Sequence, residues 1–343
     1  MVKLEDVANK VGISKTTVSR VLNNDQTLTV TDETREKIKA AVDELGYKPL
    51  RKKKVKAKKK QYHIAMVHND EAFRSTVDRA FYFSIRNGIE QMSLKKSINI
   101  ISAPIDHLPT IKEEYANVID GAIILGNLSR AQHEEIRKNI NTDHFVVIGL
   151  ANPYPDVYDQ ISFNTRNAVY KVLDYLISLG HEKIGCLGAQ EFSGILDTDS
   201  RKLLFTKYMK EKQLYRDEWV IFGDKGTEAG QDMAKQLLEL EDLPTALFIA
   251  NDPTAIGVVQ ALQDHGLKVP EDISIVGFNG DYTTEYTYPP LSTLKVNTRE
   301  MGMEAILCLL ERVNDERKLA KKVEMATHII ERKSSRLISM VES

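Results

Sequence analysis

The chain has 343 residues, enough for two or three domains, and at 42% hydrophobic and 28% charged it has the composition of a water-soluble globular protein. No apolar run is long enough to cross a bilayer, and the start, MVKLED, lacks the apolar segment of a secretory signal. The two cysteines, Cys186 and Cys308, lie far apart in apolar surroundings, so we expect reduced, buried thiols. We therefore expect a cytoplasmic protein with no membrane partner.

Charge is divided unevenly along the chain, although the formal net charge is only −2. Residues 1–60 contain 16 Lys and Arg against 8 Asp and Glu, whereas the rest of the chain contains 31 against 41. Most of the excess lies in residues 51–60, RKKKVKAKKK. A basic first sixth favours contact with a polyanion such as nucleic acid. A solvated linker, extended by its own charge, explains the run equally well.

The first 46 residues predict three short helices around a small shared core. The segment LEDVANKVG has one apolar face and stops at Gly12, a residue type that commonly ends helices. Ser14 is a good N-cap for a second helix, and Thr31 for a third, DETREKIKAAVDELGY, which Gly46 ends. The expected inward residues are Leu4, Val7, Ala8, Val11, Val18, Val21, Leu22, Ile38, Ala41, Val42 and Leu45.

The second helix has an outer face that suits DNA. The segment GISKTTVSRVLNND is rich in poor helix formers and has few large apolar residues. With those facing inward, Lys15, Thr16, Ser19 and Arg20 fall on the outer side. Arg can form paired hydrogen bonds with guanine, and Lys and hydroxyl groups can contact phosphates, as in the major-groove helix of a helix-turn-helix. A solvated helix face looks similar, so the prediction depends on the whole 46-residue pattern.

From Tyr62 onward, short β-rich runs alternate with longer amphipathic segments. The runs include YHIAMVH, INIISA, GAIILG, HFVVIGL, KIGCLGA, WVIF, TALFIAN and ISIVGF. Such alternation predicts parallel sheets with helices on both faces. About ten strands favour two doubly wound halves over a single sheet.

The sequence resembles the LacI/GalR family of transcriptional repressors over nearly its whole length. The motifs that carry the resemblance occur in order: DVA, VSRVLN, TREKI, LGYKP, LGHEKIGCLG, ANDPTAIGVVQAL, VPEDISIVGFNG and PPLSTL. The resemblance implies an all-α helix-turn-helix head at residues 1–46, a basic hinge or linker at 47–61, and an α/β two-lobed body like a periplasmic binding protein at 62–340. The family's body crosses three times between lobes, which implies lobe one at about 62–161 and 293–323, and lobe two at about 162–292 and 324–340.

The resemblance also implies the DNA contacts. Lys15 and Thr16 would occupy the main specificity positions, Arg20 would follow on the same helix, and Asn23 would lie at its end against the DNA backbone. The full set of predicted DNA-binding residues is Ser14, Lys15, Thr16, Thr17, Ser19, Arg20, Asn23, Lys52, Lys53, Lys54 and Val55.

The linker departs from the family pattern. In relatives this segment folds as a short helix on operator binding and inserts a leucine into the minor groove, at a cost of about a few kcal/mol. Here the position falls near Val55 or Lys56, and neither is leucine. We therefore expect Lys52–Lys54 to bind phosphates, with Val55 at most a weak wedge, so that operator affinity falls steeply with salt.

Polar residues that follow predicted strands indicate a ligand site between the lobes. Asn251 and Asp252 follow one buried strand, Asn279 follows another, and Arg201 begins a helix, so all should lie near the crevice. The resemblance implies that Arg201, Asp252 and Asn279 form hydrogen bonds with a small effector. Helix capping by Asp252 and a surface position for Arg201 are the alternatives.

The expected effector is a sugar, which would also stack on aromatic rings. Phe81, Tyr82 and Phe222 are the candidate platforms, although a core position fits each of them equally well. The loop NNDQTLTV looks about two residues longer than the family norm, as in the branch with galactose and galactoside regulators. Arg201 would equally serve an organic acid or a sugar phosphate.

No sequence motif predicts catalysis, a metal site or a cofactor. The chain contains no GxxxxGK[ST], HExxH, G-x-S-x-G or dinucleotide fingerprint. We therefore expect not an enzyme but a repressor whose affinity for double-stranded operator DNA is changed by the effector.

Two heads on a near-palindromic operator imply a homodimer, and the tail RLISMVES is too short for tetramer-forming heptads. A sugar-binding protein without a DNA role is the alternative, and the basic head argues against it.

Overall fold

The computed structural model of the protein describes residues 2–23, 25, 28–47, 61–69, 78–189 and 200–338. The chain divides into two compact units, Met1–Lys59 and Lys60–Ser343, here called the head and the body. The predicted phosphate contacts of Lys52, Lys53 and Lys54 and the predicted wedge Val55 lie outside the described residues.

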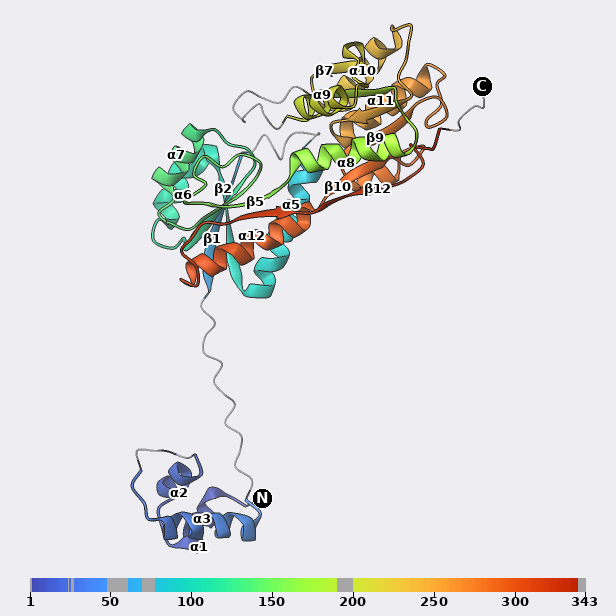
Figure 1. The fold of residues 1–343 in the computed structure, drawn as a ribbon. Helices are drawn as coiled ribbons and strands as arrows, with labels where there is room; N and C mark the ends of the chain where they lie inside the picture. The colour runs from blue at the N-terminus through green and yellow to red at the C-terminus, as the bar shows by residue number, and fades with distance from the viewer. Residues whose placement is uncertain are drawn as a thin grey trace. The chain divides into compact units, whose positions relative to one another are not determined.

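The head is the predicted three-helix unit (Figure 1), with α1 at Leu4–Val11, α2 at Lys15–Leu22 and α3 at Asp32–Leu45. The hydroxyl oxygens of Ser14 and Thr31 accept hydrogen bonds from the N–H groups of Thr17 and Thr34, at 3.1 and 3.3 Å, so both predicted caps are confirmed. Gly12 ends α1 in the left-handed conformation that glycine adopts easily. The core consists of six buried apolar residues: Val7, Ala8, Val18, Val21, Ile38 and Ala41.

The body contains two six-stranded sheets, which confirms the two predicted halves. The sheet of lobe one has the order β11-β5-β4-β3-β1-β2, and all its neighbouring strands are parallel. Its strands are β1 (Tyr62–His68), β2 (Ile98–Pro104), β3 (Gly121–Leu125), β4 (Phe145–Ile148), β5 (Asp159–Phe163) and β11 (Lys322–Met325).

The sheet of lobe two has the order β12-β10-β9-β8-β6-β7 and is parallel except for β12, which runs antiparallel to β10. Its strands are β6 (Ile184–Ala189), β7 (Val220–Gly223), β8 (Ala246–Ile249), β9 (Ser274–Asn279), β10 (Ser292–Val296) and β12 (Thr327–Ile330). The described residues thus form two more strands than the expected ten, because β11 and β12 are short and lack a continuous apolar run.

Helices cover the sheets of both lobes (Figure 1). Lobe one has α5 (Arg79–Lys96), η1 (Ile105–His107), α6 (Leu108–Tyr115), α7 (Arg130–Asn139) and α12 (Thr298–Val313). Lobe two has α8 (Thr165–Ser178), α9 (Arg201–Glu211), η3 (Asp217–Trp219), α10 (Thr227–Leu238), α11 (Asp252–Asp264) and η4 (Tyr282–Glu285). Helices α5 and α12 approach so closely that a Cβ atom on Gly302 would lie 2.1 Å from the carbonyl oxygen of Ile85.

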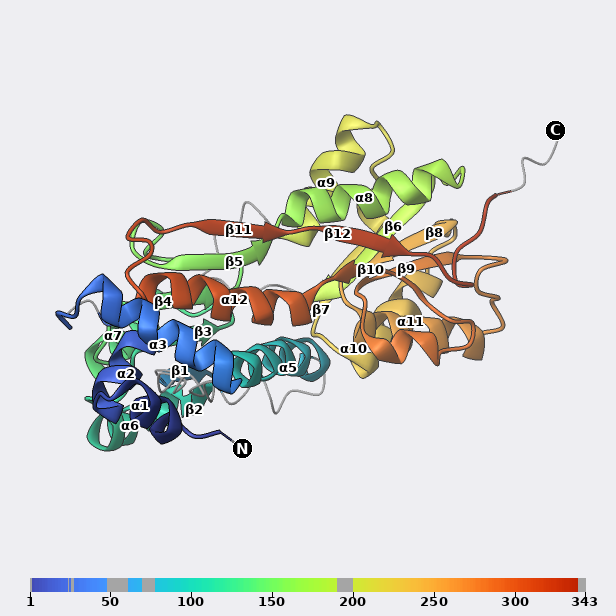
Figure 2. The same ribbon diagram turned by 90° about the horizontal axis from the view of Figure 1, so that it is seen from below.

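The chain passes between the lobes three times, a few residues later than expected. Phe163 still belongs to the sheet of lobe one, Val296 to that of lobe two, and Met325 to that of lobe one. The lobe boundaries expected at about residues 161, 292 and 323 lie two to four residues before these strand ends. Figure 2 shows β11 and β12 as an almost continuous strand that joins the two sheets.

Candidate DNA-contacting helix and effector site

Helix α2 presents its polar face to solvent. Lys15 and Thr16 are exposed and Ser19 and Arg20 are half-buried, whereas Val18, on the opposite side, is fully buried. This arrangement follows from the helical period, since the three apolar residues of α2 face the head core. The predicted outward positions of the polar side chains are therefore confirmed, and their contacts with DNA stay a prediction.

Two carboxylates in the head lie beside the basic residues of α2. Asp25 Oδ2 accepts a hydrogen bond from Arg20 Nε at 2.8 Å, and Glu5 Oε2 lies 3.6 Å from Lys15 Nζ. At the end of α2, the side-chain amide of Asn23 donates to the carbonyl oxygen of Ser19 at 2.6 Å. The basic groups that would meet DNA thus already have acidic neighbours within the head.

An ion pair joins the two lobes of the body. Asp78, immediately before α5 in lobe one, pairs with Lys225, which follows β7 in lobe two. The start of α5 and the segment after β7 therefore lie close together, on the two sides of the expected crevice. Sequence reasoning missed both residues, although Lys225 lies in the glycine-spaced segment GDKGTEAG, which is typical of a turn.

Three predicted effector residues lie close together at the carboxyl edge of the sheet in lobe two. Asn251 caps α11, since its Oδ1 accepts a hydrogen bond from the N–H of Thr254 at 2.9 Å. Asn279 ends β9 with φ of 115°, which is unusual for a residue other than glycine. Asp252 lies beside them and is fully buried.

Both carboxylate oxygens of Asp252 already accept hydrogen bonds within the chain, and its contact with an effector stays a prediction. Oδ2 accepts from the N–H of Asp281, and Oδ1 accepts from the hydroxyl of Thr293, both at 2.7 Å. Burial, with the nearby charge of Asp281, raises the pKa of Asp252 to about 8. Asp252 thus connects α11 to the segment after β9 and to β10.

Asp281 extends this group of charges toward lobe one. Burial raises its pKa to about 6, the charge of Lys295 lowers it, and the charge of Asp78 raises it. Lys295 Nζ in turn donates to the carbonyl oxygen of Gly280 at 2.8 Å. Asp281 lies only two residues after Asn279, and the same strand-end argument would have found it from the sequence.

Arg201 and the candidate platforms both pack on the core and keep part of their surface exposed. The guanidinium of Arg201 lies 4.4 Å from the ring centroid of Phe278, and Lys202 Nζ lies 5.3 Å from that of Phe222. Phe81 and Tyr82 lie on α5, where burial and Asp78 raise the pKa of the Tyr82 hydroxyl to about 12. These residues thus come from both lobes, as a site between the lobes requires.

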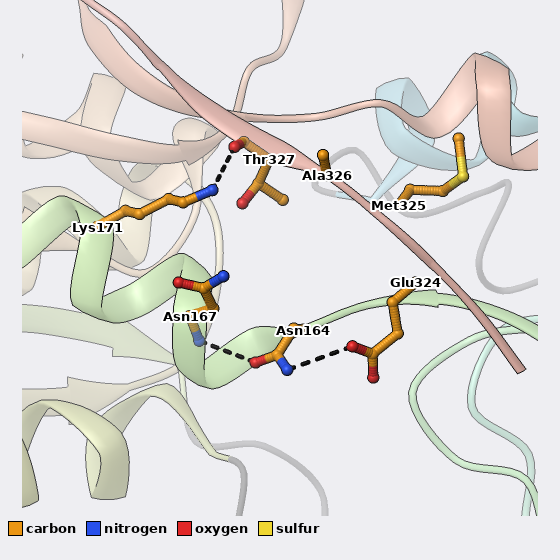
Figure 3. A pocket seen from close by; sticks show the side chains of 7 residues that line it. All are labelled: Asn164, Asn167, Lys171, Glu324, Met325, Ala326 and Thr327. Carbon is orange, nitrogen blue, oxygen red and sulfur yellow. Dashed lines mark hydrogen bonds between the residues drawn. The ribbon is translucent and has the colours of Figure 1, made fainter.

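A small groove lies where the chain crosses between the lobes (Figure 3). Two hydrogen bonds beside it link the crossing segments: Asn164 Nδ2 donates to Glu324 Oε2 at 3.3 Å, and Asn297 Nδ2 donates to the carbonyl oxygen of Ala326 at 2.8 Å. The groove is lined by Asn164, Asn167, Lys171, Glu324, Met325, Ala326 and Thr327. These hydrogen bonds join the segments through which the chain passes from one lobe to the other.

Within the described residues, no cluster of three or more His, Cys, Asp or Glu side chains is arranged to hold a metal ion. In the same part of the chain, no helix is both long and apolar enough to span a membrane. Both cysteines are buried and unpaired, and burial raises the pKa of the Cys308 thiol to about 12.

A helix-turn-helix head on a two-lobed α/β body is the architecture of a ligand-responsive, DNA-binding regulator. Residues 3–49 match the model of bacterial regulatory proteins of the lacI family, and residues 173–335 match that of a periplasmic binding protein-like domain. The transcriptional repressor MelR of Bacillus subtilis (strain 168) is 34% identical over an alignment of 343 positions, which covers 97% of this chain and 97% of MelR. The chain therefore belongs to the LacI family and is a DNA-binding transcriptional regulator rather than an enzyme.

Two solved structures share this fold over almost the whole chain. The transcriptional regulator CelR in complex with cellobiose has a TM-score of 0.68 at 23% identity, covering 98% of this chain and 100% of that one. The lac repressor dimer bound to operator and the anti-inducer ONPF has a TM-score of 0.65 at 24% identity, covering 98% and 99%. The predicted family and fold class are confirmed.

Proposed function

We propose that the protein is a repressor of carbohydrate-utilisation genes whose operator affinity is changed by a sugar bound between the lobes. The observation that carries the proposal is the division of labour along the chain. A small head carries Lys15, Thr16 and Arg20 on the outer side of one helix, and a separate body carries candidate ligand groups on both of its lobes. A regulator of promoter DNA acts where the chromosome is, in the cytoplasm.

The chemistry of the crevice supports a sugar. Half-buried rings at Phe81, Tyr82 and Phe222 offer stacking surfaces, and the amide of Asn279 and the guanidinium of Arg201 offer hydrogen bonds to hydroxyl groups. The likeness in fold to a regulator solved with cellobiose adds support. Within the sugars we propose a galactose or galactoside type, on the length of the NNDQTLTV loop. An organic acid or a sugar phosphate is the alternative that Arg201 permits.

The coupling would come from the placement of the lobes. A ligand shifts operator affinity only if it binds the two lobe arrangements with different affinity. In the arrangement of this structure, the lobes are linked by the Asp78–Lys225 ion pair and by hydrogen bonds of Asn164 and Asn297 at the crossings. We propose that the effector favours one of the two arrangements and so changes the spacing of two linkers in a homodimer on a near-palindromic operator.

The test separates operator binding from ligand response. The operator is first selected from a random duplex library with the full-length protein, and its affinity is then measured with and without mono- and disaccharides, acids and sugar phosphates. Arg20→Ala should weaken operator binding but leave ligand-induced thermal shifts unchanged. Arg201→Ala should do the reverse. If no duplex is enriched over random sequence, or if Arg201→Ala abolishes operator binding, the proposal is wrong.

The proposed binding of phosphates by the linker is tested by measuring operator affinity at several salt concentrations. Neutralising Lys52, Lys53 and Lys54 should flatten the fall of log affinity with log salt by roughly one unit of slope for each phosphate that is no longer bound. Replacing three exposed lysines of the body, such as Lys183, Lys207 and Lys235, is the matched control and should leave the slope unchanged. An equal slope in both triple variants would contradict the proposed binding of phosphates by the linker.

A further inference from the structure

Asp25, in the segment after the DNA-contacting helix, binds Arg20 at two places. Its backbone N–H donates to the carbonyl oxygen of Arg20 at 3.1 Å, and its carboxylate accepts from Arg20 Nε at 2.8 Å. Its own carbonyl oxygen accepts from the N–H of Leu28 at 3.3 Å, and Leu28 packs against the head core. Asp25 is therefore fixed both to the end of α2 and to the core.

This geometry restricts the direction of the Arg20 side chain. Arginine loses considerable rotamer freedom when it orders on binding, and a contact that orders it beforehand reduces that cost. Paired recognition of guanine uses two nitrogens of the guanidinium in a fixed plane. A hydrogen bond through Nε sets the orientation of that plane, since Nε is part of the same rigid group.

We infer that Asp25 is a positioning residue for operator recognition: it orients the guanidinium of Arg20 toward one base pair and so sets the specificity of α2. The inference rests on the proposed role of α2 in contacting operator bases. It goes beyond that role because Asp25, an anion, gains nothing from meeting DNA and would act through Arg20.

The electrostatic effect of Asp25 has the opposite sign from its positioning effect. A carboxylate beside a DNA-binding surface repels phosphates, so its removal should raise affinity for any duplex. Glu5 provides a matched control, since it is a carboxylate beside Lys15 on the same helix, but its oxygen lies 3.6 Å from the ammonium, beyond hydrogen-bonding distance. Its removal reports the charge effect alone.

The experiment measures the affinity of the full-length protein for the selected operator, for operators changed at each single base pair, and for random duplex. Arg20→Ala first identifies the base pair that Arg20 recognises. Asp25→Ala should lower the preference for that base pair over the other three by about five-fold or more. This is the lower end of the discrimination that one paired Arg–guanine contact provides. Its affinity for random duplex should stay equal or rise, as in Glu5→Ala. Glu5→Ala should keep the discrimination.

The double variant distinguishes positioning from a general structural role. In an Arg20→Ala background, Asp25→Ala should cause no further loss of discrimination, because the group that it orients is gone. Asp25→Asn, which keeps an acceptor for Nε, should recover part of the specificity and guards against misfolding of the alanine variant. A loss that persists without Arg20, or that Glu5→Ala reproduces, overturns the inference. If Arg20→Ala changes no base preference, the proposed role of Arg20 fails instead.

Discussion

The head and the body bury different kinds of side chain. All six buried residues in the core of the head are apolar, and none of the described polar residues of the head is buried. In the body, Asp159 and Asp252 are each fully buried, and both accept hydrogen bonds from residues distant in the sequence. The head therefore depends on a small apolar core with capped helices, whereas the body also depends on paired polar groups that lie far apart in the sequence.

That difference follows from what each part does. A 46-residue unit has little interior, and burying an unpaired charge there would exceed its stability. The body must instead hold three crossing segments and two sheets in register. Buried polar pairs favour one such arrangement, because each polar group is stabilised only by a suitable partner. If this comparison is right, substitutions in the two regions should act independently and by different physical routes.

The largest effect is expected from Asp159→Ala in the body. Asp159 Oδ1 accepts from Arg312 at 3.2 Å, from Arg317 at 2.9 Å and from the N–H of Lys321 at 3.0 Å. Removing the carboxylate leaves two arginines without their shared anion, at a cost of about 3–5 kcal/mol. Thermal unfolding should show the body transition lowered and the head unaffected. An exposed ion pair is the control: Lys183→Ala should cost at most about 1 kcal/mol.

Ile38→Ala should have the reverse effect: it should destabilise the head by a similar amount and leave the body unchanged. Ile38 is fully buried, and the cavity should cost about 2–5 kcal/mol, enough to unfold a domain of this size. Operator binding should be lost while the melting of the body and its ligand response stay intact. If the body also melts earlier, the two units are coupled in stability and the comparison fails.

A pH effect is expected in the body from Asp252. Its pKa is raised to about 8 in the folded chain, mainly by burial, above the ordinary value of 3.8. The folded state thus holds a proton that the unfolded state has lost, so this contribution to stability is present at low pH and decreases as pH rises through about 8.

The melting temperature of the body should therefore fall from pH 6 to pH 8 by more in the parent protein than in Asp252→Asn. Asparagine resembles the protonated acid, and its amide can donate to the hydroxyl of Thr293. The opposing contributions, which lower the pKa of Asp252, are the hydrogen bonds that its carboxylate accepts from Thr293 and from the N–H groups of Asp281 and Gly280. Equal pH dependence in both proteins would show that Asp252 is ionised throughout this range.

The comparison also explains which features were predictable from the sequence. The helices of the head follow from local signals: Ser14 and Thr31 lie three residues before the N–H groups that they cap. In the body, alternating strands and helices predict two sheets, but the Asp78–Lys225 pair joins residues 147 positions apart. Asp252 likewise accepts a hydrogen bond from Thr293, 41 residues away, so a rule about residues that follow strands finds Asp252 but not the group that it binds.

The smallest effect is expected from the cap of α3. Thr31→Ala removes the hydroxyl that accepts from the N–H of Thr34 at 3.3 Å and should destabilise the head by about 1 kcal/mol. Thr31→Ser keeps the acceptor and is the matched control, expected within a few tenths of parent stability. Because α3 makes no predicted base contact, operator discrimination should be unchanged once the head is folded, and the loss should appear only as an earlier head transition. A change in base preference would mean that α3 itself helps to set specificity, and the division between core and recognition within the head would have to be redrawn.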